Sequence, residues 1–144
     1  MSAVQERLPC AAGMRAHAAA FVARATARSR LPLDYSVPSL RVVDHLLDGL
    51  RKGGADRDRA AGALFGLGAY VGEVLVRRAG AVWVDFDVEQ RAYFGQRVGV
   101  RMPDGRVWNP LGKVANRLAC GGPEESLQTF YLTLHGRARR TDGC

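Results

Sequence analysis

The sequence contains few of the residues that most metal sites require. Three cysteines and three histidines occur in 144 residues, and no two of them have the spacing of metal ligands. These residues are Cys10, Cys120, Cys144, His17, His45 and His135. The odd number of cysteines argues against a framework of disulfide bonds, so we expect free thiols. We predict no metal site and no cofactor, with a zinc site assembled from distant ligands as the alternative.

The sequence motifs of common enzymes are missing as well. There is no G-x-S-x-G turn, no H-E-x-x-H pair and no P-loop. The segment Gly66–Gly68 lies within a predicted helix and not between a strand and a helix, so it is not a phosphate-binding loop. The motifs therefore leave open whether the chain is an enzyme.

Long apolar runs are also absent. No stretch of eighteen apolar residues occurs, which predicts no membrane span and no membrane partner. The apolar segment at residues 18–23 is short and lies between arginines, which is not typical of a signal peptide. We therefore expect a cytoplasmic protein.

Positive charge is abundant but unevenly distributed. The net charge is +7, and only two of the 21 basic residues are lysines. Residues 1–30 carry five arginines against one glutamate, and residues 136–144 carry three arginines against one aspartate, which leaves the middle of the chain almost neutral. A nucleic-acid-binding protein usually carries its basic residues on the folded body. Nucleic-acid association through the two terminal arms is therefore only an alternative.

The most apolar segment, residues 60–78, predicts a buried helix. At 100° per residue, apolar and small side chains cover well over half of its circumference, and Gly66, Tyr70, Glu73 and Arg77 share the remaining face. The segment contains four glycines, each costing about 1 kcal/mol relative to alanine inside a helix. We therefore expect a neighbouring element to pack too closely for a Cβ.

The other segments predict an α+β fold with helices packed on one face of a small, mainly antiparallel sheet. Helices are expected at residues 11–28, 38–52, 110–120 and 124–137, a strand at 81–88, a polar connection at 89–95 and a hairpin at 98–108. In the strand, alternation makes one face apolar (Val82, Val84, Phe86 and Val88) and the Trp83 face mixed.

Three regions follow from this pattern. Residues 1–30 are expected to form a basic helical arm that docks loosely, because the apolar face of its helix is thin. Residues 31–135 form a single α+β domain. Residues 136–144 form a basic, disordered tail.

The middle of the chain resembles a loose group of small, uncharacterised bacterial domains of unknown function. The resemblance covers residues 34–134 and depends on a glycine-rich helix with the pattern G-x-x-x-G-E, a strand containing tryptophan, a hairpin, and a basic helix that begins at a proline. The matching residues are Gly68, Gly72, Glu73, Trp83, Pro110, Lys113 and Arg117. The resemblance implies a fold and no activity.

Glu73 is the carboxylate for which the sequence leaves the most alternative roles open. It can form a surface ion pair with Arg77 one turn later, it can form a buried structural ion pair, or it can face Lys113 or Arg117 across a cleft that also holds Tyr70 and Trp108. Asp85 and Asp87 could hold a cation or act as an acid and a base, although such a pair more often marks a solvated strand edge.

These observations favour a non-catalytic binding or accessory protein that contacts a protein or peptide partner. The predicted binding residues are Trp108, Arg101, Lys113, Arg117 and Trp83, and a homodimer is a further possibility. The alternative is a small enzyme or tailoring factor that acts on a peptide or small molecule in a biosynthetic pathway. Its candidate catalytic residues would be Glu73, Tyr70, Lys113 and Asp85.

Overall fold

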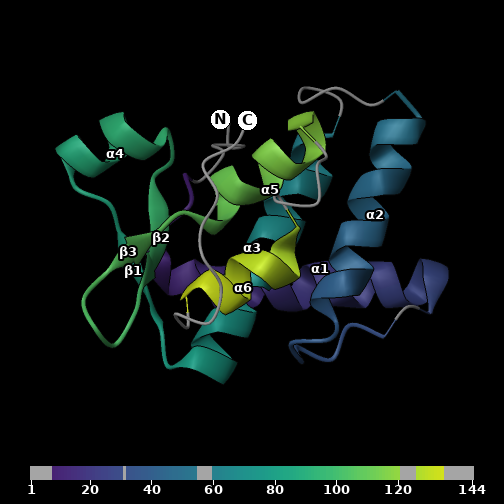
Figure 1. The fold of residues 1–144 in the computed structure, drawn as a ribbon, viewed down its shortest axis with the longest axis horizontal. Helices are drawn as coiled ribbons and strands as arrows, with labels where there is room; N and C mark the ends of the chain where they lie inside the picture. Colours follow the sequence, from purple (N-terminus) through teal and green to yellow (C-terminus); the bar gives the residue numbers. More distant parts are fainter. Residues whose placement is uncertain (1–7, 31, 55–59, 121–125, 135–144) are drawn as a thin grey trace, which may run out of the picture.

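The computed structural model describes residues 8–30, 32–54, 60–120 and 126–134. The predicted α+β class is confirmed, with helices on one face of a small antiparallel sheet (Figure 1). The elements are η1 (Ala11–Gly13), α1 (Met14–Ser29), α2 (Leu40–Lys52), α3 (Ala61–Ala79), β1 (Val82–Asp85), α4 (Val88–Phe94), β2 (Val98–Arg101), β3 (Val107–Trp108), α5 (Pro110–Cys120) and α6 (Leu127–Leu134). The predicted tail at 136–144 lies outside the described residues. No helix in the described part is long and apolar enough to cross a bilayer.

Helix α3 is the centre of the fold, and α1 and α5 pack against it. Every residue from Gly66 to Leu75 is buried. This includes Tyr70 and Glu73, so the face that was predicted to be polar is buried except at Arg77. The polar groups on this face must therefore find partners within the protein.

The close packing predicted at the glycines of α3 is confirmed at three of them. A Cβ on Gly66 would lie within 3 Å of the Phe21 ring of α1. A Cβ on Gly68 would equally overlap Leu111 of α5, and one on Gly72 would overlap the indole of Trp83 in β1. The fourth glycine, Gly62, differs from these three, because a Cβ there would meet nothing within 4 Å.

Helix α1 belongs to this core. Met14 and Ala18 are fully buried, and Phe21 is buried against α3. The expectation that the N-terminal helix docks only loosely is therefore wrong. Its apolar face is thin because the glycine at position 66 lets a single phenylalanine approach the α3 backbone.

The sheet has the order β1-β2-β3, and both strand pairs are antiparallel. Trp83 lies opposite Val100, and Val100 lies opposite Trp108. Directly opposed residues have their side chains on the same face, so these three side chains face the helices. Val82 and Arg101 form the next opposed pair and lie on the outer face.

The apolar and mixed faces predicted for residues 81–88 do not correspond to a buried and an exposed face. Val82 and Val88 of the apolar set are exposed, whereas Phe86 of the same set is buried. Trp83 instead covers Gly72 of α3. The reason is that the indole, the largest apolar group of the strand, fits the space that the glycine leaves open.

Residues 88–94 form helix α4, where the sequence predicted the end of a strand and a polar connection. Asp87 caps the helix by accepting a hydrogen bond from the Gln90 N–H, and the Gln90 side chain accepts one from the Asp87 N–H. Gly95 ends the helix in the left-handed conformation. These residues form a complete capping box with a glycine terminator, a signal that is present in the sequence.

Candidate functional site

Of the three alternatives predicted for Glu73, the structure contains the buried structural ion pair. Its exposure is only 2%, and its carboxylate accepts hydrogen bonds from Trp83 Nε1 (3.1 Å) and Arg77 Nε (3.2 Å). The ion pair with Arg77 is therefore present, but the carboxylate is not at the surface. Arg117 is hydrogen-bonded to α2 instead. Arg117 therefore does not face Glu73, as one of the alternatives required.

Tyr70 holds the segment before α2 against α3. Its hydroxyl oxygen accepts a hydrogen bond from the Tyr35 N–H (2.8 Å) and lies 2.6 Å from Ser39 Oγ. The two tyrosine rings stack at 5.0 Å, and the Arg77 guanidinium covers the other side of the Tyr35 ring. Burial raises the pKa of Tyr70, although the Ser39 hydrogen bond opposes this effect. The phenol is therefore a structural donor and acceptor and not a catalytic base.

We expect Tyr70→Phe to lower the free energy of unfolding by about 2 kcal/mol, because it leaves the Tyr35 N–H and Ser39 without their partner. Urea unfolding followed by tryptophan fluorescence measures this effect. Tyr93→Phe is the matched control, because the Tyr93 side chain is exposed and its variant should differ by less than about 0.5 kcal/mol. Equal stabilities for the two variants would contradict the role given to the Tyr70 hydroxyl.

Asp85, the last residue of β1, and Asp87, two residues later, have separate hydrogen-bond partners. Asp85 accepts a hydrogen bond from the Ala11 N–H (2.8 Å), and Asp87 caps α4. Within the described residues, no group of three or more His, Cys, Asp or Glu side chains could hold a metal ion. Both carboxylates therefore have structural partners.

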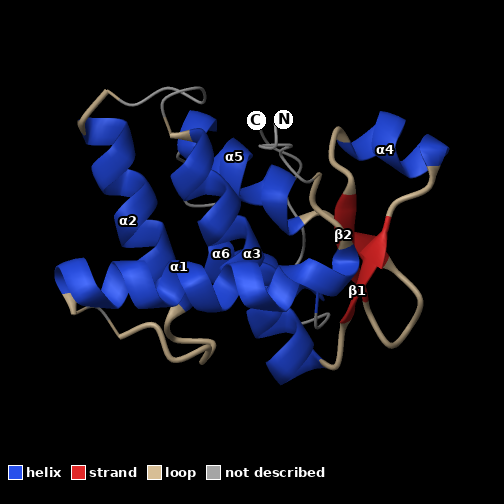
Figure 2. Cartoon of the chain, turned by 180° about the vertical axis from the view of Figure 1, so that it is seen from behind, coloured by secondary structure: helices blue, strands red, loops and turns tan. Residues whose placement is uncertain are grey.

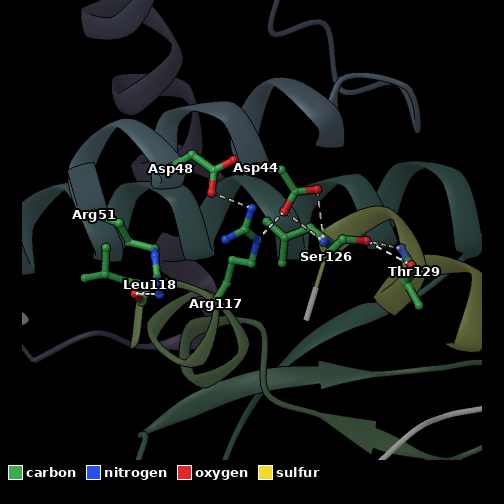
Figure 3. A network of polar contacts seen from close by, with 8 residues as sticks. Asp44, Asp48, Arg51, Arg117, Leu118, Ser126 and Thr129 are labelled. Carbon is green, nitrogen blue, oxygen red and sulfur yellow. Dashed lines mark hydrogen bonds and ion pairs between the residues drawn. The ribbon is translucent and has the colours of Figure 1, made fainter. Parts of the chain in front are cut away.

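Arg117 lies in a polar network between α2, α5 and α6 (Figure 3). Its Nε donates to Asp44 (3.0 Å), and its Nη2 donates to Asp48 (2.9 Å), one turn later on α2. Asp44 also accepts from the Leu127 N–H at the start of α6. The network therefore joins three helices.

Burial raises the pKa of Asp44, although the hydrogen bonds from Leu127 and Arg117 act in the opposite direction. Burial also opposes the charge on Arg117, but the hydrogen bond to Asp48 and the charge of Asp44 together raise the pKa of Arg117. The arginine is therefore charged at all physiological pH values. Two carboxylates occupy its Nε and Nη2, whereas its buried Nη1 has no hydrogen-bond partner among the described residues.

The remaining predicted binding residues lie on two faces of the sheet. Trp83 is on the helix-facing side and donates its Nε1–H to Glu73, so it is a core residue. Arg101 is exposed on the outer face. Of the five residues predicted for binding, Trp108 and Lys113 line a common cavity.

That cavity has a volume of about 700 Å³ and lies between α4, β3, α5 and α6. We call it the α4–α5 cleft. Its lining consists of Tyr93, Phe94, Gly95, Gln96, Val107, Trp108, Asn109, Gly112, Lys113, Asn116 and Phe130. Its volume is within the range of small-molecule sites, which is about 300–1,000 Å³.

The cleft combines aromatic rings with amides and one cation. Trp108 and Phe130 meet edge to face at 6.0 Å, and Lys113 Nζ lies 5.7 Å from the centre of the Phe130 ring. Asn109 is tied to the backbone, because its Nδ2 donates to Phe94 O (3.0 Å) and its Oδ1 accepts from the Gly112 N–H (3.0 Å). The predicted start of α5 at Asn109 and Pro110 is thereby confirmed. No carboxylate, imidazole or thiol is present in the described lining, whose ionisable groups are the Tyr93 phenol and the Lys113 ammonium.

Helix α4 supplies an aromatic wall, where the sequence predicted a polar connection. Phe94 stacks on Phe86 at 4.8 Å, and Tyr93 meets Phe94 edge to face at 4.9 Å. Tyr93 is 83% exposed at the mouth of the cleft. The capping box at Asp87 was the available signal for a helix that presents these two rings.

No family model, no curated protein and no solved structure matches the chain.

The cysteines differ from one another: Cys10 is a free, exposed thiol, whereas Cys120 is disulfide-bonded. The expectation of free thiols is therefore wrong for Cys120.

Proposed function

We propose that the protein is a non-catalytic accessory protein that binds a segment of a partner protein in the α4–α5 cleft. The observation that carries this proposal is the composition of the lining, in which the aromatic side chains of Tyr93 and Trp108 accompany Lys113. Tryptophan and tyrosine are the residues most enriched at the energetic centres of protein interfaces. The cleft admits a few side chains and not a folded domain.

The charge of the cleft indicates the chemistry of the partner. Lys113 is the only charged side chain in the described lining, and its ammonium group lies beside an aromatic ring. A segment with an apolar or aromatic residue next to a carboxylate would match this arrangement. The amides of Gln96 and Asn116 can bond the backbone of such a segment.

The four candidate catalytic residues support the enzyme alternative less than the cleft supports the binding proposal. Glu73 and Tyr70 are buried in structural hydrogen bonds, and Asp85 is bonded to the backbone of Ala11. Only Lys113 lines the cleft. The nucleic-acid alternative depends on two terminal arms, of which residues 1–7 and 136–144 lie outside the described residues.

A photo-crosslinking amino acid at position 93 tests the proposal. Introduced in the native host, it should capture a defined partner, whose purified form is then titrated against the unlabelled protein. We expect Tyr93→Ala and Lys113→Ala each to weaken this binding by about tenfold or more, which corresponds to at least about 1.4 kcal/mol. Trp108→Ala is less suitable, because Trp108 also packs against the core.

Val88→Ala is the matched control. Val88 is on the same helix and is also exposed, but it does not line the cleft. Its variant should bind the partner within about twofold of the unsubstituted protein. If all three variants bind equally well, the partner does not occupy the cleft and the proposal is overturned.

A further inference from the structure

A second cavity lies on the opposite part of the helical layer, between α1, α2 and α3. Figure 2 shows α1 running across the other two helices. The cavity has a volume of about 530 Å³ and shares no residue with the α4–α5 cleft. We call it the three-helix pocket. Its apolar wall includes Phe21, Ala25, Leu46, Leu50, Ala63 and Leu67.

Two glycines keep this pocket wide. Gly49 of α2 and Gly62 of α3 both line it, and a Cβ on either would meet no atom within 4 Å. Neither glycine has a positive φ, so the backbone does not require glycine there. A glycine inside a helix costs about 1 kcal/mol relative to alanine. Unlike Gly66, these two glycines make no close contact that offsets the cost, and what they provide is open space in the pocket.

The rim of the pocket is positively charged. Arg24 and Arg28 line it and are one turn apart on α1, so both guanidinium groups reach the same side of the helix. Both residues are exposed, and neither has an ion-pair partner within the described part of the chain. No acidic residue is present in the described lining. The pocket therefore combines an apolar interior with two adjacent cations at its mouth.

We propose that the three-helix pocket binds an aliphatic monocarboxylate, with the chain between the helices and the carboxylate at Arg24 and Arg28. Each methylene group that leaves water for the apolar interior favours binding by about 0.8 kcal/mol. Guanidinium groups form charge-assisted, paired hydrogen bonds with a carboxylate, and a partly apolar surrounding strengthens them. This assignment is independent of the partner proposed for the α4–α5 cleft.

Calorimetric titration with decanoate, below its micelle concentration, tests the inference. We expect saturable binding at one site, at least tenfold weaker binding of decanol and no measurable binding of acetate. Decanol keeps the chain without the charge, and acetate keeps the charge without the chain. Vesicles of phosphatidylglycerol form a further arm, because they present anionic head groups whose acyl chains are held in a bilayer.

Two variants separate the contributions of the rim and the interior. Arg24→Gln combined with Arg28→Gln should remove the preference for decanoate over decanol. Gly49→Leu should weaken both ligands at least tenfold, because its side chain fills the pocket where nothing now lies within 4 Å. Arg15→Gln and Ala19→Leu, at exposed positions of α1 outside the pocket, are the matched controls and should leave binding unchanged. Circular dichroism confirms that each variant is folded.

Three results would overturn the inference. Decanoate could fail to saturate, the Arg24 and Arg28 variant could keep its preference for decanoate, or Gly49→Leu could bind as well as the unsubstituted protein. Binding to the anionic vesicles, with no binding of free decanoate, would assign the two arginines to a membrane surface instead and would equally reject a monocarboxylate site.

Discussion

Replacing Arg117 by methionine should lower the free energy of unfolding by about 3 kcal/mol at neutral pH. Methionine keeps the length and apolar body of the side chain but removes the donors to Asp44 and Asp48. The Asp48 side chain is 47% exposed and can return to water, whereas the Asp44 side chain is only 15% exposed. The expected loss therefore comes mainly from a carboxylate that stays buried with the Leu127 N–H as its remaining hydrogen-bond donor.

The loss should depend on pH in a defined direction. Burial already raises the pKa of Asp44 above its ordinary value of 3.8, and removal of Arg117 should raise it further. A carboxyl group with a raised pKa in the folded state favours folding below its unfolded pKa, and this contribution is lost as the pH rises through the folded pKa. The difference between Arg117→Met and the unsubstituted protein should therefore be small near pH 3 and largest at neutral pH.

Two further proteins test the cause. Asp44→Asn added to Arg117→Met should restore part of the lost stability and remove the pH dependence of the difference, because asparagine is neutral and can still accept from the Leu127 N–H. Arg106→Met removes the shorter but exposed ion pair with Asp104 (2.7 Å) and should cost much less than Arg117→Met, because water screens exposed charges. If the Arg117 and Arg106 variants lose the same free energy of unfolding in urea titrations, burial of the network does not determine how much it stabilises the protein.

The periodicity of the sequence predicts the helices well, since this signal is local. The spacing of apolar residues places α2 and α3 within a few residues of their observed bounds. Asn109 and Pro110 mark the start of α5, and Pro103–Asp104–Gly105 marks the turn of the hairpin. The glycines of α3 also predict correctly that other elements pack closely on this helix.

The candidate site could not be predicted in the same way, because it depends on contacts between distant segments. Arg117 is buried because Asp44 and Asp48, about seventy positions earlier, lie opposite it on α2. Its position on α5 gives no sign of this contact. The pairing of Trp83 with Glu73 likewise requires β1 to turn its tryptophan face toward α3, whereas alternation of valines favoured the other orientation. A lone carboxylate on an apolar helix therefore marked a buried hydrogen bond and not a catalytic group.

Gly72→Ala should be the most damaging single substitution in α3, with an expected loss of about 3 kcal/mol or more. The new Cβ would lie 2.1 Å from Trp83 Cη2 and 2.3 Å from Cζ2, so the indole must move. This movement would break the hydrogen bond from Trp83 Nε1 to Glu73, and the buried carboxylate would keep only Arg77. The helical preference for alanine, about 1 kcal/mol, is too small to offset both effects.

Gly62→Ala provides the matched comparison within the same helix. Nothing lies within 4 Å of a Cβ at this position, so the substitution should be neutral or should stabilise the protein by up to about 1 kcal/mol. Trp83→Leu removes the ring that the alanine would meet, and in that background Gly72→Ala should cost much less than it does alone. A double-mutant cycle measured by urea unfolding gives this coupling directly. If Gly72→Ala lowers the free energy of unfolding equally with and without the indole, the contact between α3 and β1 is not the reason that position 72 requires glycine.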